Sequence, residues 1–290
     1  MKKIGVLLII LSGLLWGSMG VLLKITQSFG FSAINCTALR LGSAALILWI
    51  CVGIFSPKSL KIRLKDLPML LLCGAVSMGT MSALYLTSID LTSVSVAAVL
   101  LYMSPVWVMI FSVIFLKEKL TVKKALAAVI AFVGCACIAG LSGDVKLSAL
   151  GIVLGVLSGI FYASYSIFCT FALKNNNGIT VTCYAFLFAT IVSLCIGNVP
   201  GIVRVVSDAD NVLKLLGSVF LLGLITAVLP FALYTVGLKY VNASKAAVLV
   251  CVEPLTAAVL GFWIYDEPLN FLGIGLILIA ILMLSVKGKE

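Results

Sequence analysis

Long apolar segments separated by short polar breaks run along the whole chain. Crossing a bilayer as a helix takes about 20 mostly apolar residues, whereas a membrane β-strand takes about 10 residues of alternating character. The segments reach the first length and do not alternate, so we predict ten transmembrane helices, called spans 1 to 10 in chain order. They cover residues 4–24, 31–55, 67–88, 92–116, 122–140, 147–173, 179–199, 212–237, 243–264 and 269–286.

The breaks between the spans are too short to hold a folded soluble domain. They contain turn-forming residues, as at 56–58, 142–144 and 175–178. Composition supports the membrane assignment, because 63% of the 290 residues are hydrophobic and 10% are charged. Soluble domains carry about 25% charged residues. Lipid must therefore cover most of the protein surface.

The net charge of +10 follows the predicted topology. With the amino terminus inside, fourteen Lys and Arg residues lie in cytoplasmic segments, and the four in external breaks are Lys24, Lys146, Arg204 and Lys214. This bias predicts a multi-pass protein of the cytoplasmic membrane with both termini in the cytoplasm. It also explains the basic character without a nucleic-acid partner. Span 1 is too long for an ordinary signal core and is predicted to be retained.

Cysteine and histidine usage gives no indication of a metal site or a cofactor. All nine cysteines fall within predicted spans, no Cys-x-x-Cys pair occurs, and the chain has no histidine. Buried cysteines of this kind are ordinary small packing residues. We therefore predict no metal, no cofactor and no disulfide framework.

The chain repeats itself once. Shifted by 149 residues, segment 83–105 lies on 232–254, and at a shift of 146 segment 11–18 lies on 157–164. The first alignment pairs Pro105 with Pro254 and Glu118 with Glu267. Each half, 1–145 and 146–290, contains five spans, and an odd number forces the halves to cross the membrane in opposite directions. The predicted fold is an all-α integral membrane protein built as two inverted five-helix repeats, an arrangement common in secondary transporters.

Several motifs resemble the drug/metabolite transporter superfamily, in its ten-helix EamA-type branch. They are Leu15-Trp16-Gly17-Ser18 in span 1, Arg40 in span 2, Glu253-Pro254 in span 9 and Glu267 after it. The resemblance covers nearly the whole chain. It implies a central cavity lined mainly by spans 1, 3, 4, 6, 8 and 9. It also implies transport, often efflux, of amino acids or other small metabolites.

Glu253 is the single acidic residue near the middle of a predicted span. A charged group there is costly and usually faces a partner or a watery cavity. It is a candidate for proton coupling or for binding a substrate amine, with a structural ion pair as the alternative. Ser104 occupies the matching position in the first half, so the repeat is chemically asymmetric.

Two further charges fall inside spans. Arg40 could neutralise Glu253 or bind a substrate carboxylate, since guanidinium matches carboxylate geometry, and structural pairing is the alternative. Lys245 lies near enough to the cytoplasmic end of span 9 to extend its ammonium group to the membrane surface.

Aromatic side chains with a polar atom suit a pocket for an amphipathic metabolite. Those inside spans are Trp16, Tyr85, Tyr102, Trp107, Tyr162, Tyr165 and Tyr234. The repeat pairs Trp16 with Tyr162 and Tyr85 with Tyr234, which favours them as pocket residues, whereas Trp107 is expected to pack between helices or at the membrane interface.

Pro105 and Pro254 are expected to bend spans 4 and 9, either as gates or as static kinks. Glu118 and Glu267 precede Thr121 and Asn270, which are suitable N-caps for spans 5 and 10, and both glutamates are expected to be structural.

These features predict a secondary transporter that moves a small metabolite, such as an amino acid or a related amine or carboxylate, by alternating access. Efflux and proton coupling are the expected mode. The alternatives are an intramembrane enzyme and a channel or uptake carrier. An enzyme is disfavoured because the chain lacks histidine and clustered aspartates. The expected partners are the substrate and the lipid bilayer.

Overall fold

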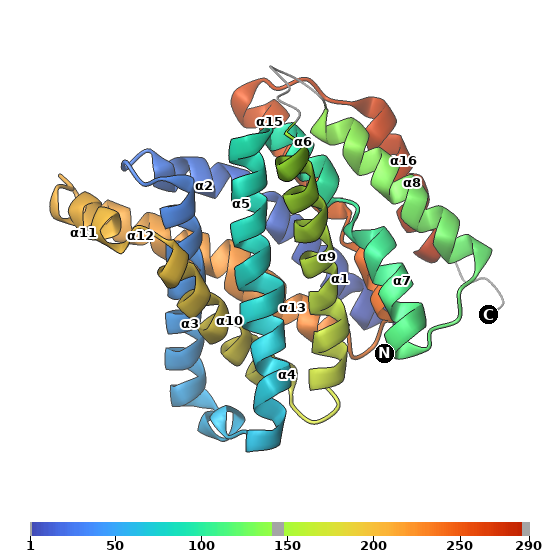
Figure 1. Cartoon of the computed structure of the whole chain (residues 1–290), viewed down its shortest axis with the longest axis horizontal. Coiled ribbons are helices and arrows are strands. Elements are labelled where there is room, and N and C mark those ends of the chain that lie inside the picture. Colours follow the sequence, from blue (N-terminus) through green and yellow to red (C-terminus); the bar gives the residue numbers. More distant parts are fainter. Residues whose placement is uncertain (1, 141–147, 286–290) are drawn as a thin grey trace.

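The computed structural model describes residues 2–140 and 148–285, and the regular elements in these ranges are helices (Figure 1). Nine of the helices described are long and apolar enough to cross a membrane, and a tenth, shorter one follows. They span Lys3–Gln27, Ala33–Phe55, Leu64–Leu91, Val94–Leu116, Val122–Ala139, Ala149–Ala172, Gly178–Ile196, Val212–Gly237, Ala243–Tyr265 and Phe271–Leu284. The predicted ten spans are confirmed. The break at 142–144 and Lys146, Lys287 and Lys289 lie outside the described residues.

Several spans consist of more than one helical element. The first half contains α1 (Lys2–Gly17), α2 (Met19–Gln27), α3 (Ala33–Phe55), η1 (Pro57–Leu60), η2 (Leu64–Asp66), α4 (Leu67–Leu71), η3 (Leu72–Thr80), α5 (Met81–Leu91), α6 (Val94–Leu101), α7 (Ser104–Leu116) and α8 (Val122–Ala139). The second half contains α9 (Ala149–Ala172), α10 (Gly178–Ile196), α11 (Val199–Ser207), α12 (Val212–Gly223), η4 (Leu224–Val228), α13 (Leu229–Gly237), α14 (Ala243–Leu249), α15 (Val252–Tyr265) and α16 (Phe271–Ser285).

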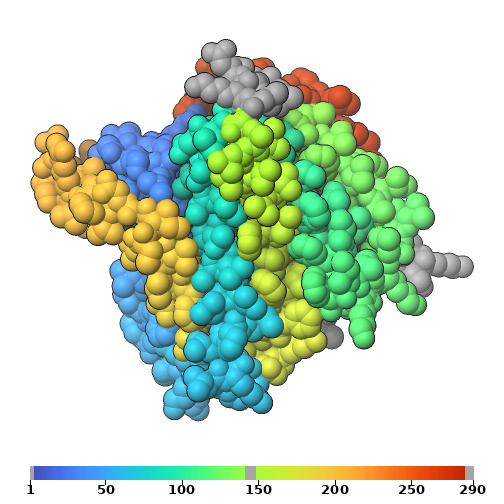
Figure 2. All heavy atoms as spheres, in the orientation of Figure 1, coloured from blue at the N-terminus to red at the C-terminus, as the bar shows by residue number. Residues whose placement is uncertain are grey.

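The helices pack into a main bundle and a peripheral pair. On the face shown in Figure 2, span 3 (α4, η3 and α5) runs the height of the molecule with α9 beside it, and α10 packs on its η3 segment. The main core includes side chains from spans 1, 2, 3, 6, 7 and 8. The peripheral pair, α8 and α16, packs along its length (Figure 1), and together with side chains of span 9 such as Val248 it forms a second core that includes Ala131 and Ile277.

One helix was missed by the hydropathy pattern. Residues 200–211 were expected to be a break, but α11 occupies most of this stretch, and Asn198 caps it by accepting a hydrogen bond from Gly201 N at 3.0 Å. Its Ile202 and Val205 pack on a small cluster that contains Phe31 and Leu215. At nine residues α11 is too short to cross a bilayer, so hydropathy alone does not detect it.

The inverted repeat is visible in the irregularities of the helices. The third span of each half contains a π-helical segment, η3 in one and η4 in the other. Spans 4 and 9 are both interrupted, after Leu101 and after Leu249. The expected bends at Pro105 and Pro254 are therefore full breaks, and each proline lies at the start of the helix after the break, where its missing N–H costs least.

Two glycines in equivalent repeat positions let neighbouring helices approach these breaks. A Cβ atom on Gly159 in span 6 would lie 2.8 Å from Leu100 O in span 4. A Cβ atom on Gly13 in span 1 would lie 3.0 Å from Val250 O and would collide with Val252 in span 9. Only glycine allows such close backbone contact. The shared Ser-Gly sequence therefore seats each first helix of a half against the broken helix of the other half.

Replacing Gly13 by alanine is expected to destabilise the protein by about 1–3 kcal/mol, because the added methyl group overpacks this contact. Thermal unfolding in detergent measures the change. Gly20→Ala is the matched control in the same span: nothing lies within 4 Å of its Cβ position, so stability is expected to be unchanged or slightly higher. Equal losses in the two variants would contradict the contact argument.

Candidate functional site

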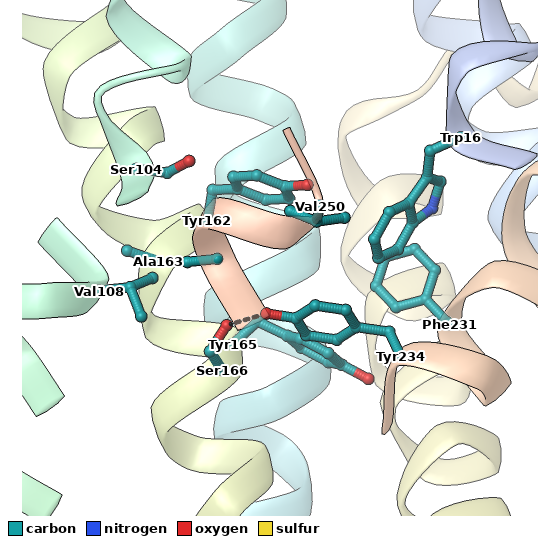
Figure 3. Close-up of a pocket in the computed structure, with 11 residues that line it drawn as sticks. Trp16, Ser104, Val108, Tyr162, Ala163, Tyr165, Ser166, Phe231, Tyr234 and Val250 are labelled. Carbon is teal, nitrogen blue, oxygen red and sulfur yellow. Dashed lines mark hydrogen bonds between the residues drawn. The ribbon is translucent and has the colours of Figure 1, made fainter. Parts of the chain in front are cut away.

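A small cavity lies between helices of the two halves (Figure 3). Its wall comes from spans 1, 4, 6, 8 and 9. Trp16, Ser104 and Tyr162 lie near the middle of their spans, whereas Tyr234 lies near the end of span 8 and Ala247 near the beginning of span 9. The residues are Trp16, Ser104, Val108, Tyr162, Ala163, Tyr165, Ser166, Phe231, Tyr234, Ala247 and Val250. The cavity thus lies between the two halves, as the substrate sites of inverted-repeat carriers do.

One wall of the cavity is an aromatic cluster. The Trp16 and Phe231 rings meet edge to face, with centroids 4.8 Å apart at an interplanar angle of 80°. Tyr165 meets Phe231 in the same manner at 5.3 Å, and Tyr234 lies 5.5 Å from Trp16. Edge-to-face contacts fix ring orientation, so this wall is a rigid, apolar surface with polar edges.

Hydrogen bonds fix the two tyrosine hydroxyl groups of that wall. Tyr234 Oη pairs with Ser166 Oγ at 2.8 Å, as Figure 3 shows, and Tyr165 Oη pairs with Thr235 Oγ1 at 2.9 Å. Each pair joins α9 of span 6 to α13 of span 8. Buried hydroxyl groups are thereby satisfied, and the phenol rings are held in place beside the cavity.

Two opposite charges lie close to the cavity. The Arg40 guanidinium donates to Thr226 O in η4 at 3.3 Å, and it lies within electrostatic range of Glu253 and Tyr162. Arg40 and Glu253 do not form one of the ion pairs found among the described residues. Arg40 is thus held by a backbone carbonyl with the carboxylate of Glu253 in its neighbourhood, and intramembrane charges that bond to carbonyls commonly mark functional sites.

The residues predicted from sequence fall into two groups. Trp16, Ser104, Tyr162 and Tyr234 line the cavity. Glu253, Arg40, Tyr85 and Tyr102 are not among its lining residues, but Glu253 is within electrostatic range of each of the other three and of Tyr162, which lines the cavity. Span 3 does not line the cavity, in contrast to the expectation from the family resemblance. Both members of the pair Trp16 and Tyr162 therefore line the cavity, whereas of the pair Tyr85 and Tyr234 the second one does so.

Sequence reasoning overlooked several lining residues. Ser166 and Phe231 lie within one turn of predicted site residues, so helical spacing from Tyr162 and Tyr234 could have found them, whereas Tyr165 was among the aromatic candidates but was not singled out by the repeat. The small or aliphatic ones, Val108, Ala163, Ala247 and Val250, carry no chemical signal in an apolar sequence.

The remaining candidates contribute to packing and capping. Trp107 packs against the main core, as expected. Thr121 caps α8 and Asn270 caps α16, accepting bonds from Lys124 N at 3.3 Å and Gly273 N at 3.0 Å. The carboxylate of Glu118 instead bonds to span 9. Lys245 lies half-buried in α14.

An inverted repeat of five-helix halves, with a cavity between them and broken helices beside it, is typical of membrane transporters. The EamA-like transporter family model matches residues 3–140 and 149–286, and the chain belongs to this family.

Relatives and one solved structure agree with this assignment. A protein of Archaeoglobus fulgidus described as an uncharacterized transporter is 31% identical over 65% of this chain and 64% of its own length. A probable terminal-alkyne amino-acid exporter of Streptantibioticus cattleyicolor is 24% identical over 90% of this chain and 85% of its own. A crystal structure at 15% identity superposes with a TM-score of 0.80 over 98% of this chain and 96% of the other, which shows the shared fold.

Proposed function

We propose that this protein exports a small metabolite with an amine and a carboxylate, of the amino-acid type, across the cytoplasmic membrane by alternating access. Proton exchange at Glu253 drives the movement. The two halves, 1–145 and 146–290, act as the moving units. Both termini lie in the cytoplasm, so that most of the lysines lie on the cytoplasmic side.

The observation that carries this proposal is the central cavity with two unneutralised charges beside it. An amino acid offers an ammonium group for Glu253 and a carboxylate for Arg40, and bidentate guanidinium contacts suit a carboxylate. The aromatic wall of Trp16, Phe231 and Tyr234 suits an apolar side chain.

Export is supported by the name of one relative, the probable terminal-alkyne amino-acid exporter. The test is flux in proteoliposomes loaded with a panel of amino acids and decarboxylated amines, with and without an imposed pH gradient. Saturable flux that accelerates with the gradient is the expected result. Flux that rises linearly with concentration would indicate a channel instead, and turnover of the substrate into a product would indicate an enzyme.

Replacing Trp16 by alanine is expected to reduce the apparent affinity for the substrate about tenfold. The indole ring forms the aromatic wall, and removing a packed aromatic contact costs about 1–3 kcal/mol of binding free energy. Trp263→Ala is the matched control, because Trp263 is 77% exposed on the outer surface of the bundle, whereas Trp16 is 6% exposed. An unchanged KM for Trp16→Ala would remove the aromatic wall from the proposed binding site.

A further inference from the structure

The loops that follow spans 4 and 9 are the same piece of structure in the two halves. Lys117 and Asp266 both adopt left-handed backbone geometry with φ of 54°. The next residue is a glutamate in each case, and its N–H bonds back across the turn: Glu118 N to Ser112 O at 3.0 Å, and Glu267 N to Gly261 O at 3.3 Å. The backbone is therefore the same at the two glutamates, and their side chains start in equivalent directions.

Their carboxylates nevertheless have different partners. Glu118 Oε1 accepts a hydrogen bond from Ala243 N at 3.0 Å, Oε2 accepts one from the Ser244 hydroxyl, and Lys124 Nζ lies 3.4 Å away. The Glu118 side chain is 10% exposed. These bonds join the end of span 4 to the beginning of span 9, at the cytoplasmic ends of both spans in the proposed topology.

On the external side the matching contact is not made. Glu267 is 58% exposed and pairs with Lys24 Nζ at 3.6 Å, and this ammonium group also lies over the Tyr265 ring. The positions that match Ala243 and Ser244 are Val94 and Ser95, at the beginning of span 4. Val94 is 63% exposed, whereas Ala243 is 1% exposed.

Helix packing shows the same asymmetry. On the cytoplasmic side α14 packs against α7, and within the described residues no comparable packing joins α6 to α15. The sequence nevertheless contains the groups for a contact at both ends, Glu118 with Ser244 and Glu267 with Ser95. In this structure the contact between Glu118 and Ser244 is formed. The interface of spans 4 and 9 is therefore closed at its cytoplasmic end and parted at its external end.

We infer that Glu118 and Glu267 are alternating latches of the transport cycle. Glu118 holds the cytoplasmic ends of spans 4 and 9 together in the outward-facing state described here. In the opposite state Glu267 leaves Lys24 and accepts hydrogen bonds from Val94 N and the Ser95 hydroxyl, while Glu118 releases Ala243 and Ser244. This inference rests on the proposed transport function.

The arrangement suits a carrier energetically. Release of one latch breaks two charge-assisted hydrogen bonds, and closure of the other forms two of the same kind. Hydrogen bonds to charged groups are individually strong, so an unmatched latch would strongly favour one state. Matched latches keep both states populated, which a carrier requires in order to move between them. While a latch is open, a lysine holds its carboxylate: Lys124 holds Glu118, and Lys24 holds Glu267.

Two cysteine reporters test the inference, because substituting a side chain leaves the backbone donor in place. Val94→Cys reports opening on the external side, and Ala243→Cys reports opening on the cytoplasmic side. Each is labelled with a membrane-impermeant maleimide, in right-side-out and inside-out vesicles respectively. The labelling rate is compared with that of the same protein without the reporter, which corrects for the native cysteines.

Glu118→Ala is expected to raise labelling of Ala243→Cys about tenfold or more and to lower labelling of Val94→Cys by a similar factor. Glu267→Ala, the matched variant, is expected to leave Val94→Cys labelling as high as before or higher, with no rise at Ala243→Cys. The double variant restores intermediate rates at both reporters. Ser244→Ala removes one hydrogen bond with little change in shape, and a smaller shift in the same direction as Glu118→Ala is expected.

A static clasp gives a different result. If Glu118→Ala exposes Ala243→Cys but leaves Val94→Cys labelling unchanged, the ends are not coupled and the latch inference is wrong. Shifts of the same sign in the two glutamate variants would also overturn it. Labelling requires no substrate, so opposite shifts without flux of any tested metabolite would retain the latches and reject the proposed transport function.

Discussion

Replacing Glu253 by glutamine is expected to abolish the acceleration of transport by a pH gradient. Glutamine matches glutamate in size but cannot gain or lose a proton. It also presents a neutral group to a substrate ammonium, and a hydrogen bond to a charged partner contributes about 1.5–3 kcal/mol. The KM for an amine-bearing substrate is therefore expected to rise about 10- to 150-fold. Proteoliposome flux with and without the gradient measures both effects.

The two effects separate the roles open to Glu253. Loss of gradient dependence with an unchanged KM indicates a proton carrier, and a raised KM with gradient dependence intact indicates an amine site. Flux that stays at full rate and still responds to the gradient would leave Glu253 with a structural role. Asp208→Asn is the matched control, because Asp208 lies exposed beside Arg204 at 3.5 Å and far along the chain from any span centre.

The sequence predicted the fold well because lipid imposes a simple rule on it. Every backbone polar group in a bilayer must be satisfied within the helix, so each span appears as a long apolar run. The repeat was detectable because Pro105 with Pro254 and Glu118 with Glu267 recur at fixed spacing. The amphipathic α11 was not detected in this way, since a helix of nine residues has no such run.

The sequence predicted site residues whose side-chain chemistry is rare in an apolar chain. It did not predict residues that reach the cavity wall through the way the helices pack. Glu253 and Arg40 stand out in an apolar sequence, and the aromatic pair Trp16 and Tyr162 was indicated by the repeat. Residues such as Ala163 and Val250 enter the cavity wall because helices meet at particular angles, which no local pattern encodes.

Helix breaks show the same limit. The sequence indicated a bend at each repeated proline, but the close approach of Gly13 and Gly159 to the broken segments depends on contacts between halves that are distant in sequence. The partner of Glu118 could not be predicted for the same reason: Thr121 nearby suggested a local cap, whereas Ala243 lies 125 residues away along the chain.

Replacing Arg40 by glutamine is expected to raise the KM for amino acids about 10- to 150-fold, because the charged partner of the substrate carboxylate is lost. The KM for a decarboxylated amine of the same side chain is expected to change little, since that ligand does not need the guanidinium group. Flux of both ligands through the same variant measures the difference. Arg204→Gln is the control: its side chain is 85% exposed, and a surface ion pair contributes little.

The comparison of ligands also tests the structural alternative. Arg40 donates to Thr226 O in η4, so a purely structural role would loosen spans 2 and 8 and impair both ligands equally, with a lower unfolding temperature. Selective loss of the carboxylate-bearing ligand in Arg40→Gln, together with loss of both ligands in Glu253→Gln, would place the two charges at the two ends of one substrate. In the double variant the two losses should then add for the amino acid, whereas the decarboxylated amine should behave as it does in Glu253→Gln alone, because it makes no contact with Arg40.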